Sequence, residues 1–222
     1  MPYRLRDNLH WCENGGRAVF LDVETDRYFC LSATANDAFL ALRRGEDLDG
    51  GFRSLRALVE RGLLIATTTQ AAALEPPSLE EPVRDFLPEP TGRAGVGQTA
   101  RALFHEFHAA LLVRTRPFRS VIAIASARNC RVLLGAGNPE GRIASLVRAF
   151  QSTALVTRAH DRCLVRALAV HAACTRRGIR PKLVFGVIAH PFSAHCWVQF
   201  GASVLVGEFE QARLYTPILV IG

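Results

Sequence analysis

A cysteine and a histidine in the last third of the chain have the setting that thiol chemistry requires. Cys163 begins an apolar stretch typical of a helix, and His195 follows 32 positions later in a β-like run over residues 193–198. A thiolate attacks a carbonyl far better than a thiol does, and a helix N-terminus lowers the pKa of a thiol. A histidine can take that proton and return it to a leaving amine. The pair predicts a cysteine hydrolase.

Other polar residues around this pair extend the prediction. Asp161 is expected to cap the helix that Cys163 enters, and a third group should orient the imidazole. His160 and His190 flank the predicted centre in the sequence, and His190 is a rival base. Considered alone, Cys163 is also compatible with an ordinary buried helix cysteine.

The composition excludes several classes of function. The 222 residues are 49% hydrophobic and 21% charged, a balance typical of globular domains. The net charge is +7, and nearly all of the basic residues are arginines. No basic run contains interleaved aromatic residues, so nucleic-acid binding is not expected. Six cysteines without CxxC pairs argue against a zinc site and a disulfide framework. We therefore expect neither a metal nor another cofactor.

The N-terminus and the hydropathy pattern bear on location. Residues 1–7 lack the apolar core of a signal peptide, and no stretch of about 18 uncharged apolar residues occurs. These features predict a cytoplasmic protein without membrane contact, whose cysteines stay reduced.

A segment rich in proline, glycine and alanine divides the chain into unequal parts. Residues 67–98 contain five prolines and three glycines and are predicted to be a linker. The expected domains are therefore residues 1–66 and 99–222. In the first domain, three alternating runs joined by turns predict an antiparallel meander, and two amphipathic helices follow.

This first domain resembles the PqqD-like leader-recognition domains of peptide-modification pathways, which have a small winged-helix-like fold. The resemblance rests on residues 16–22 and 26–32. It implies that an extended leader peptide adds as a strand beside the third strand and lies against the last helix. The leader contacts that it implies come from Tyr28, Phe29, Cys30, Leu31, Leu55, Leu58 and Val59. Because strand residues alternate between faces, about half of these side chains could instead be core residues.

The second domain begins with helical periodicity and ends in β-rich runs. Four helices are expected within residues 99–177, and four strands within residues 182–220. Helices followed by an antiparallel sheet make an α+β fold.

The order of helix cysteine and strand histidine resembles the transglutaminase-like, papain-like cysteine proteases, and most closely the protease half of lasso-peptide B proteins. The matching segments are residues 162–169, 177–179, 186–187 and 193–198. With the first domain included, the chain resembles the fused form of that family. The resemblance implies a leader peptidase that binds a ribosomally made precursor peptide. The freed core peptide would pass to a separate ATP-dependent, asparagine-synthetase-like lasso cyclase that closes the macrolactam.

One position departs from that family. Its members often carry an aspartate about a dozen residues after the histidine, where this chain has Gly207. Glu208 is the natural substitute, Glu210 would share its face of a strand, and a backbone carbonyl could serve instead. The departure keeps open a non-catalytic scaffold that binds the leader and supports the cyclase. A transferase that passes the acyl group to a second amine is also conceivable.

Overall fold

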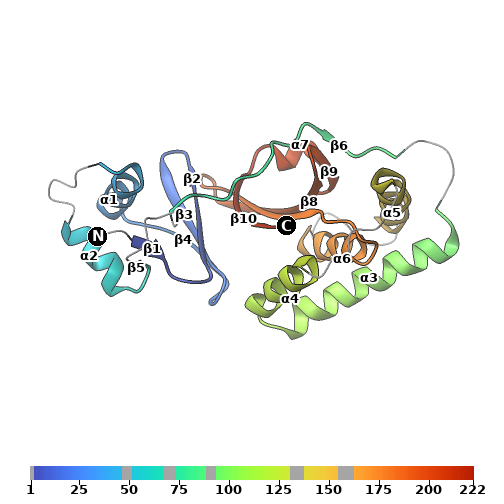
Figure 1. The fold of residues 1–222 in the computed structure, drawn as a ribbon, viewed down its shortest axis with the longest axis horizontal. Helices are drawn as coiled ribbons and strands as arrows, with labels where there is room; N and C mark the ends of the chain where they lie inside the picture. Colours follow the sequence, from blue (N-terminus) through green and yellow to red (C-terminus); the bar gives the residue numbers. More distant parts are fainter. Residues whose placement is uncertain (1–2, 47–51, 68–73, 89–93, 131–137, 155–162) are drawn as a thin grey trace. The chain divides into compact units, whose positions relative to one another are not determined.

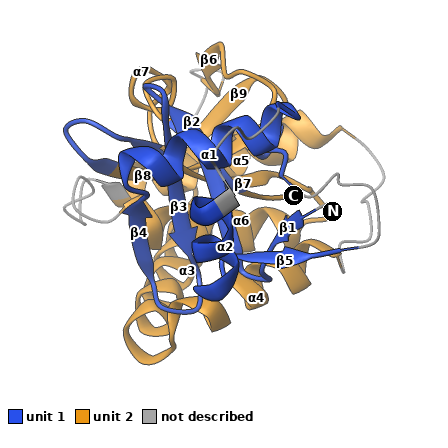
Figure 2. Cartoon of the chain, turned by 90° about the vertical axis from the view of Figure 1, so that its left-hand side faces the viewer, with its two compact units in different colours: residues 1–78, 187–193, 216–219 blue, residues 79–186, 194–215, 220–222 orange. Residues whose placement is uncertain are grey.

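The computed structural model describes residues 3–46, 52–67, 74–88, 94–130, 138–154 and 163–222. The described chain divides into two compact units (Figure 2). The first comprises Met1–Ser78 with Val187–Ser193 and Thr216–Leu219, and the second comprises the remaining residues from Leu79 onward. The first boundary between the units, after Ser78, lies within residues 67–98, but the first unit also includes two segments from the predicted second domain. Among the described residues, no helix has the length and apolarity needed to cross a membrane.

The predicted meander forms the centre of the first unit. Strands β2 (Leu9–Asn14), β3 (Arg17–Asp22) and β4 (Arg27–Cys30) pair antiparallel in the order β2-β3-β4. The β2–β3 turn uses Gly15 and Gly16, both with positive φ, which glycine adopts without steric cost. The strand alternation in the sequence therefore predicted these three elements.

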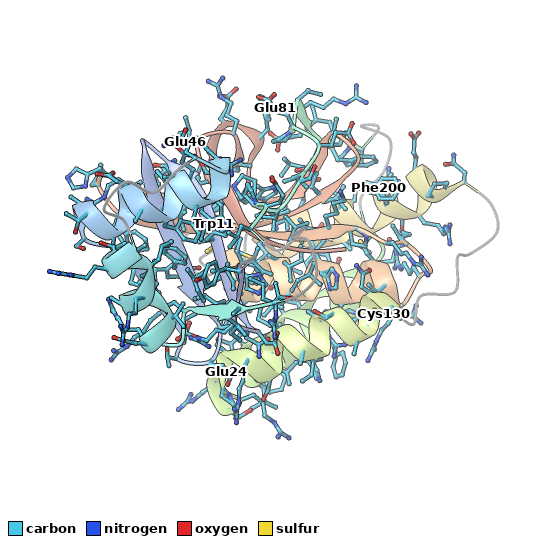
Figure 3. The ribbon with its side chains drawn as sticks, turned by 60° about the vertical axis from the view of Figure 1, so that its left-hand side comes forward. Trp11, Glu24, Glu46, Glu81, Cys130 and Phe200 are labelled. Carbon is cyan, nitrogen blue, oxygen red and sulfur yellow. The ribbon has the colours of Figure 1, made fainter. Side chains whose placement is uncertain are left out.

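Two helices and a small second sheet complete the first unit. Their bounds are α1 (Ala33–Arg44), α2 (Phe52–Glu60), β1 (Tyr3–Leu5) and β5 (Leu64–Ala66). Strands β1 and β5 pair antiparallel with each other. Trp11 is buried in the core (Figure 3). Its ring lies nearly perpendicular to that of Phe39 from α1, with the ring centroids 4.8 Å apart. This core holds the helices against one face of the meander.

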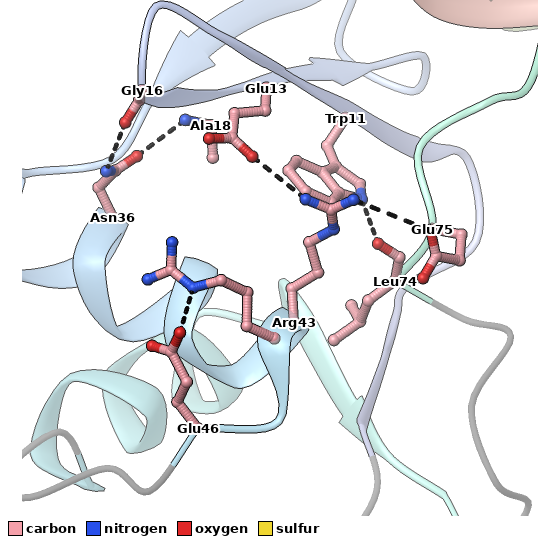
Figure 4. Close-up of polar contacts among 10 residues, drawn as sticks. Trp11, Glu13, Gly16, Ala18, Asn36, Arg43, Glu46, Leu74 and Glu75 are labelled. Carbon is pink, nitrogen blue, oxygen red and sulfur yellow. Dashed lines mark hydrogen bonds and ion pairs between the residues drawn. The ribbon is translucent and has the colours of Figure 1, made fainter.

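Polar side chains fix α1 to the sheet (Figure 4). The buried Asn36 side chain accepts a hydrogen bond from the Ala18 N–H at 2.8 Å and donates one to the Gly16 carbonyl at 3.2 Å. Arg43 lies over the Trp11 ring, whose Nε1 donates to the Leu74 carbonyl at 3.0 Å. Each contact satisfies a polar group that burial would otherwise penalise.

The second unit packs helices around one central helix (Figure 1). Its main helices are α3 (Val96–Thr115), α4 (Phe118–Cys130), α5 (Pro139–Ala154) and α6 (Cys163–Thr175). Helices α3, α4 and α5 all contact α6, which is buried from Ala167 to Thr175. A helix that is apolar all round has to be enclosed in this way.

A five-stranded sheet follows, with strand order β10-β7-β8-β9-β6. The strands are β6 (Arg84–Asp85), β7 (Lys182–Ile188), β8 (Ser193–Phe200), β9 (Ser203–Val206) and β10 (Thr216–Ile221). Helices and sheet together confirm the α+β class that the sequence predicted. The finer winged-helix description of the first domain stays a prediction.

Two elements differ from those expected. Arg84 and Asp85, within the predicted linker, form β6 and pair parallel with β9, so the sheet is not wholly antiparallel. The region expected as a strand around Glu210 is instead the short helix α7 (Phe209–Ala212). The Asp85 carboxylate accepts a hydrogen bond from the Phe209 N–H at 2.8 Å, which satisfies a donor at the start of α7.

Candidate active site

Cys163 and His195 meet by a side-chain hydrogen bond, although they lie 32 positions apart in the sequence. Cys163 is the first residue of α6, and His195 lies near the start of β8. The thiol also receives hydrogen bonds from the backbone N–H groups of Leu164 and Cys196. The helix N-terminus and these donors all favour a negatively charged sulfur.

The two groups shift each other's pKa in the directions that an ion pair requires. The hydrogen bond and the charge of the His195 ring hold the pKa of Cys163 below its ordinary value, although burial opposes them. Burial by itself would lower the pKa of His195. The hydrogen bonds to Cys163 and Gly207, with the charges of Cys163 and Glu208, outweigh burial and raise that pKa. Both pKa shifts are in the direction that favours a thiolate and an imidazolium.

A backbone carbonyl holds the other side of the imidazole. Nε2 of His195 lies 2.9 Å from the Gly207 carbonyl oxygen. A carbonyl can only accept, so Nε2 carries a proton and Nδ1 is left to face the thiol. Gly207 has φ +116°, and a Cβ there would collide with the Cβ of Trp197. An aspartate at position 207 is incompatible with this backbone.

Glu208, the predicted acid, lies next to this contact but is exposed. Its backbone has φ 60° and ψ 119° and precedes α7. Its carboxylate acts on His195 through charge, as one of the groups that raise the histidine's pKa. The hydrogen-bond acceptor that orients the ring is Gly207, the backbone alternative that the sequence left open.

The side chains on one face of β8 support the histidine. His195, Trp197 and Gln199 are two positions apart along β8, so their side chains lie on the same face of the strand. The His195 and Trp197 rings stack with centroids 6.1 Å apart, and the centroid of the Tyr215 ring lies 5.2 Å from that of the imidazole. A Cβ at Gly186 would lie 2.6 Å from the Trp197 ring, so this glycine makes room for the indole.

The buried Gln199 in turn fixes Trp197. Its Oε1 accepts from Trp197 Nε1 at 3.2 Å, and its Nε2 donates to the carbonyls of Glu80 and Gly201 at 2.6 and 2.8 Å. The sequence patterns did not identify Gln199 or Tyr215 as parts of the site, and they allowed a backbone carbonyl without specifying that of Gly207. The period-two spacing from His195 is the signal that could have identified Gln199.

Other cysteines and histidines differ from this pair. Burial raises the pKa of Cys12 and of Cys174 to about 12, and raises that of Cys196 well above its ordinary value. His190 is exposed, and its Nδ1 lies 3.3 Å from the Ala189 carbonyl oxygen. His160 and Asp161 lie outside the described residues. Cys163 and His195 thus have pKa shifts suited to a nucleophile and its base.

Comparison with known proteins gives the family of this site. A model of the transglutaminase-like superfamily matches residues 106–220, just over half of the 222-residue chain, and the match includes Cys163 and His195. The chain belongs to the transglutaminase-like superfamily. No curated protein and no solved structure matches it. The superfamily includes cysteine proteases and transglutaminases. The α+β fold and an enzymatic activity are both consistent with membership of it.

The residues predicted to bind a leader peptide have different environments in the first unit. Leu31, Leu55 and Leu58 are buried in its core. Phe29 packs against that core and stacks on Phe20 at 5.2 Å. The remaining three are more accessible: Tyr28 is half-buried, Cys30 is exposed, and Val59 is 36% exposed.

Proposed function

We propose that this chain is a thiol peptidase that removes the leader from a ribosomally made precursor peptide of the lasso class. The observation that carries the proposal is the Cys163–His195 hydrogen bond, with the thiol pKa lowered and the imidazole pKa raised. Membership of the transglutaminase-like superfamily supports it, because that superfamily includes cysteine proteases.

The chemistry follows from the geometry of the pair. The Cys163 thiolate attacks the scissile carbonyl carbon, and a thioester forms as the C–N bond breaks. The His195 imidazolium gives its proton to the departing amine, and the neutral ring then activates the water that hydrolyses the thioester. The Gly207 carbonyl keeps the ring in the required tautomer throughout.

Recognition of the leader is assigned to the first unit. Strand β4 lies at the edge of its three-stranded sheet, as drawn from the described residues, and an edge strand can pair with an extended peptide. Leu31, Leu55 and Leu58 would support this edge from the core, while Tyr28, Cys30 and Val59 would contact the peptide. Phe29 would also contact the peptide, from the partly buried face of β4. Capture by this unit raises the effective concentration of the scissile bond at Cys163.

Thiol labelling tests the activated pair without knowledge of the substrate. The full chain is treated with iodoacetamide, and each cysteine is followed by mass spectrometry. Cys163 should react faster than the exposed Cys30 and Cys130, and His195→Ala should slow its reaction towards theirs. Labelling of Cys163 no faster than of Cys30 would contradict a peptidase and favour the non-catalytic scaffold.

Cleavage tests the substrate class. The probe is a synthetic precursor peptide of the lasso class, incubated with and without a lasso cyclase and ATP. The wild type should release the leader, whereas Cys163→Ala should bind the precursor without cleaving it. Cys130→Ala, which changes an exposed cysteine outside the pair, is the matched control and should cleave normally. Persistent cleavage by Cys163→Ala would exclude the thiol mechanism.

A further inference from the structure

A cavity in the second unit is separate from the Cys163 site. It has a volume of about 490 Å³ and is lined by residues of α3, α5 and the end of α6. Neither Cys163 nor His195 belongs to its lining. Cys163 opens α6 and Arg176 follows its last residue, so 13 positions of helix separate them by about 20 Å.

The floor of this cavity is apolar. Ala102, Leu146 and Phe150 contribute to it, and each is buried among the helices. The volume and the apolar lining fall in the range typical of small-molecule sites. The floor therefore suits an apolar group of modest size.

The rim carries positive charge. Arg101 and Arg176 are exposed at the cavity, and Arg177 also lines it. Within the residues that the structure describes, the lining contains no aspartate or glutamate, and no ion pair joins Arg101 or Arg176 to a carboxylate. These guanidinium groups can therefore meet an incoming anion directly.

His105 adds a neutral donor beside the arginines. Burial, and after it the charges of Arg176 and Arg128, lower its pKa to about 4. The ring is thus uncharged at neutral pH, and the electrostatic potential around it is positive. A negative group bound beside these arginines would offset the positive charge that Arg176 and Arg128 place near His105.

We propose that this cavity binds a small amphiphilic anion, with its apolar body against Leu146 and Phe150 and its carboxylate or phosphate headgroup between Arg101 and Arg176. The site would be distinct from the peptidase centre. The inference does not depend on the proposed function, because none of these residues contacts Cys163 or His195 in the described structure.

Binding of defined probes to the full chain tests this site. Decanoate, decyl phosphate and decanol are titrated below their micelle-forming concentrations and followed by calorimetry. The charged probes should bind, and decanol should bind at least tenfold more weakly. A preference for decyl phosphate or for decanoate identifies the headgroup. Chemical-shift changes at Phe104 and His105 should locate the wild-type complex in this cavity.

Charge-neutral variants test the headgroup contacts. Arg101→Gln and Arg176→Gln should each weaken decanoate binding at least threefold, and the double variant at least tenfold. Arg114→Gln removes an exposed arginine of the same helix outside the cavity, and its affinity should stay within twofold of wild type. Equal binding of decanol, absence of binding, or equal losses in Arg114→Gln would each overturn the proposal. Cys163 labelling should be unchanged in all four variants, which separates this test from that of the peptidase.

Discussion

The backbone carbonyl of Gly207 lies 2.9 Å from Nε2 of His195, where a side-chain carboxylate was expected. A neutral main-chain acceptor fixes the imidazole tautomer as a carboxylate would, but it adds no full negative charge next to the ring. The charge that stabilises the imidazolium comes instead from the Cys163 thiolate and from the nearby Glu208. The missing aspartate is thus compensated by backbone geometry that only glycine readily adopts.

Gly207→Ala should damage the site through the backbone. The new Cβ would collide with Trp197 and approach Nε2 of His195 to 3.3 Å, at a φ of +116°. We expect the carbonyl to move, iodoacetamide labelling of Cys163 to slow at least tenfold, and the free energy of unfolding to fall by about 1–3 kcal/mol. Gly97→Ala is the control, because its Cβ would meet no atom within 4 Å. Unchanged labelling despite lower stability would show that the carbonyl does not orient His195.

Glu208→Gln should lower the pH at which activity falls on the alkaline side of the pH profile. The Glu208 charge helps to raise the pKa of His195, so its removal lets the imidazolium lose its proton at a lower pH. Hydrolysis should still rise as Cys163 ionises below its ordinary pKa of 9.0, but it should fall earlier as pH increases. Because Glu208 is exposed, the difference should shrink in 1 M salt.

Glu210→Gln is the matched control for that pH profile. Glu210 is exposed and pairs with Arg213 at 2.8 Å, and it is not among the groups that shift the pKa of His195. Its alkaline limb should match the wild type. An equal displacement in both variants would mean that general surface charge, rather than Glu208, tunes the histidine.

Glu106→Gln should destabilise the second unit. The Glu106 carboxylate lies 3.5 Å from Arg166 and accepts a hydrogen bond from Thr153 at 2.8 Å. Both charged side chains are at most 14% exposed, so loss of the Glu106 charge leaves the buried Arg166 guanidinium without this counter-charge. We expect a loss of about 3 kcal/mol. Glu60→Gln breaks an exposed pair with Arg56 and should change stability by less than about 1 kcal/mol.

Tryptophan fluorescence can assign that loss to the second unit. The two tryptophans, Trp11 and Trp197, lie in different units. In a Trp11→Phe background, urea unfolding followed by fluorescence reports Trp197 alone. A stability loss seen equally in Glu60→Gln would contradict a special role for the buried Glu106–Arg166 pair.

The sequence predicted those parts of the molecule that depend on periodic side-chain patterns. Alternation gave the meander over residues 9–30, and helical spacing gave the segments that become α1 to α6. The setting of Cys163 and His195 also singled out two residues that the fold brings into contact. Because patterns of this kind repeat over many residues, a single atypical residue does not obscure them.

The remaining features depend on single backbone positions or on tertiary contacts. The Gly207 acceptor is a main-chain atom, which has no residue type of its own in the sequence. Strand β6 has two residues in a proline-rich segment, and its pairing partner β9 lies about 120 positions away. The amphipathic spacing of Leu55, Leu58 and Val59 did not reveal that two are buried and one is exposed. Such details follow from packing that periodicity does not encode.

Gln199→Glu should reveal how far the support of His195 extends. The buried Gln199 amide donates to two carbonyl oxygens, and a carboxylate there would face both without a donor. Protonation would restore one hydrogen bond at most, so the folded state should favour the neutral acid. The unfolded chain ionises more readily, so the stability loss should be larger at pH 8 than at pH 5.

Displacement of Trp197, which stacks on His195, should also slow Cys163 labelling. Gln151→Glu adds the same charge at an exposed position of α5 and should leave both properties unchanged. A loss independent of pH would mean that the amide donors are not what holds this strand face in place.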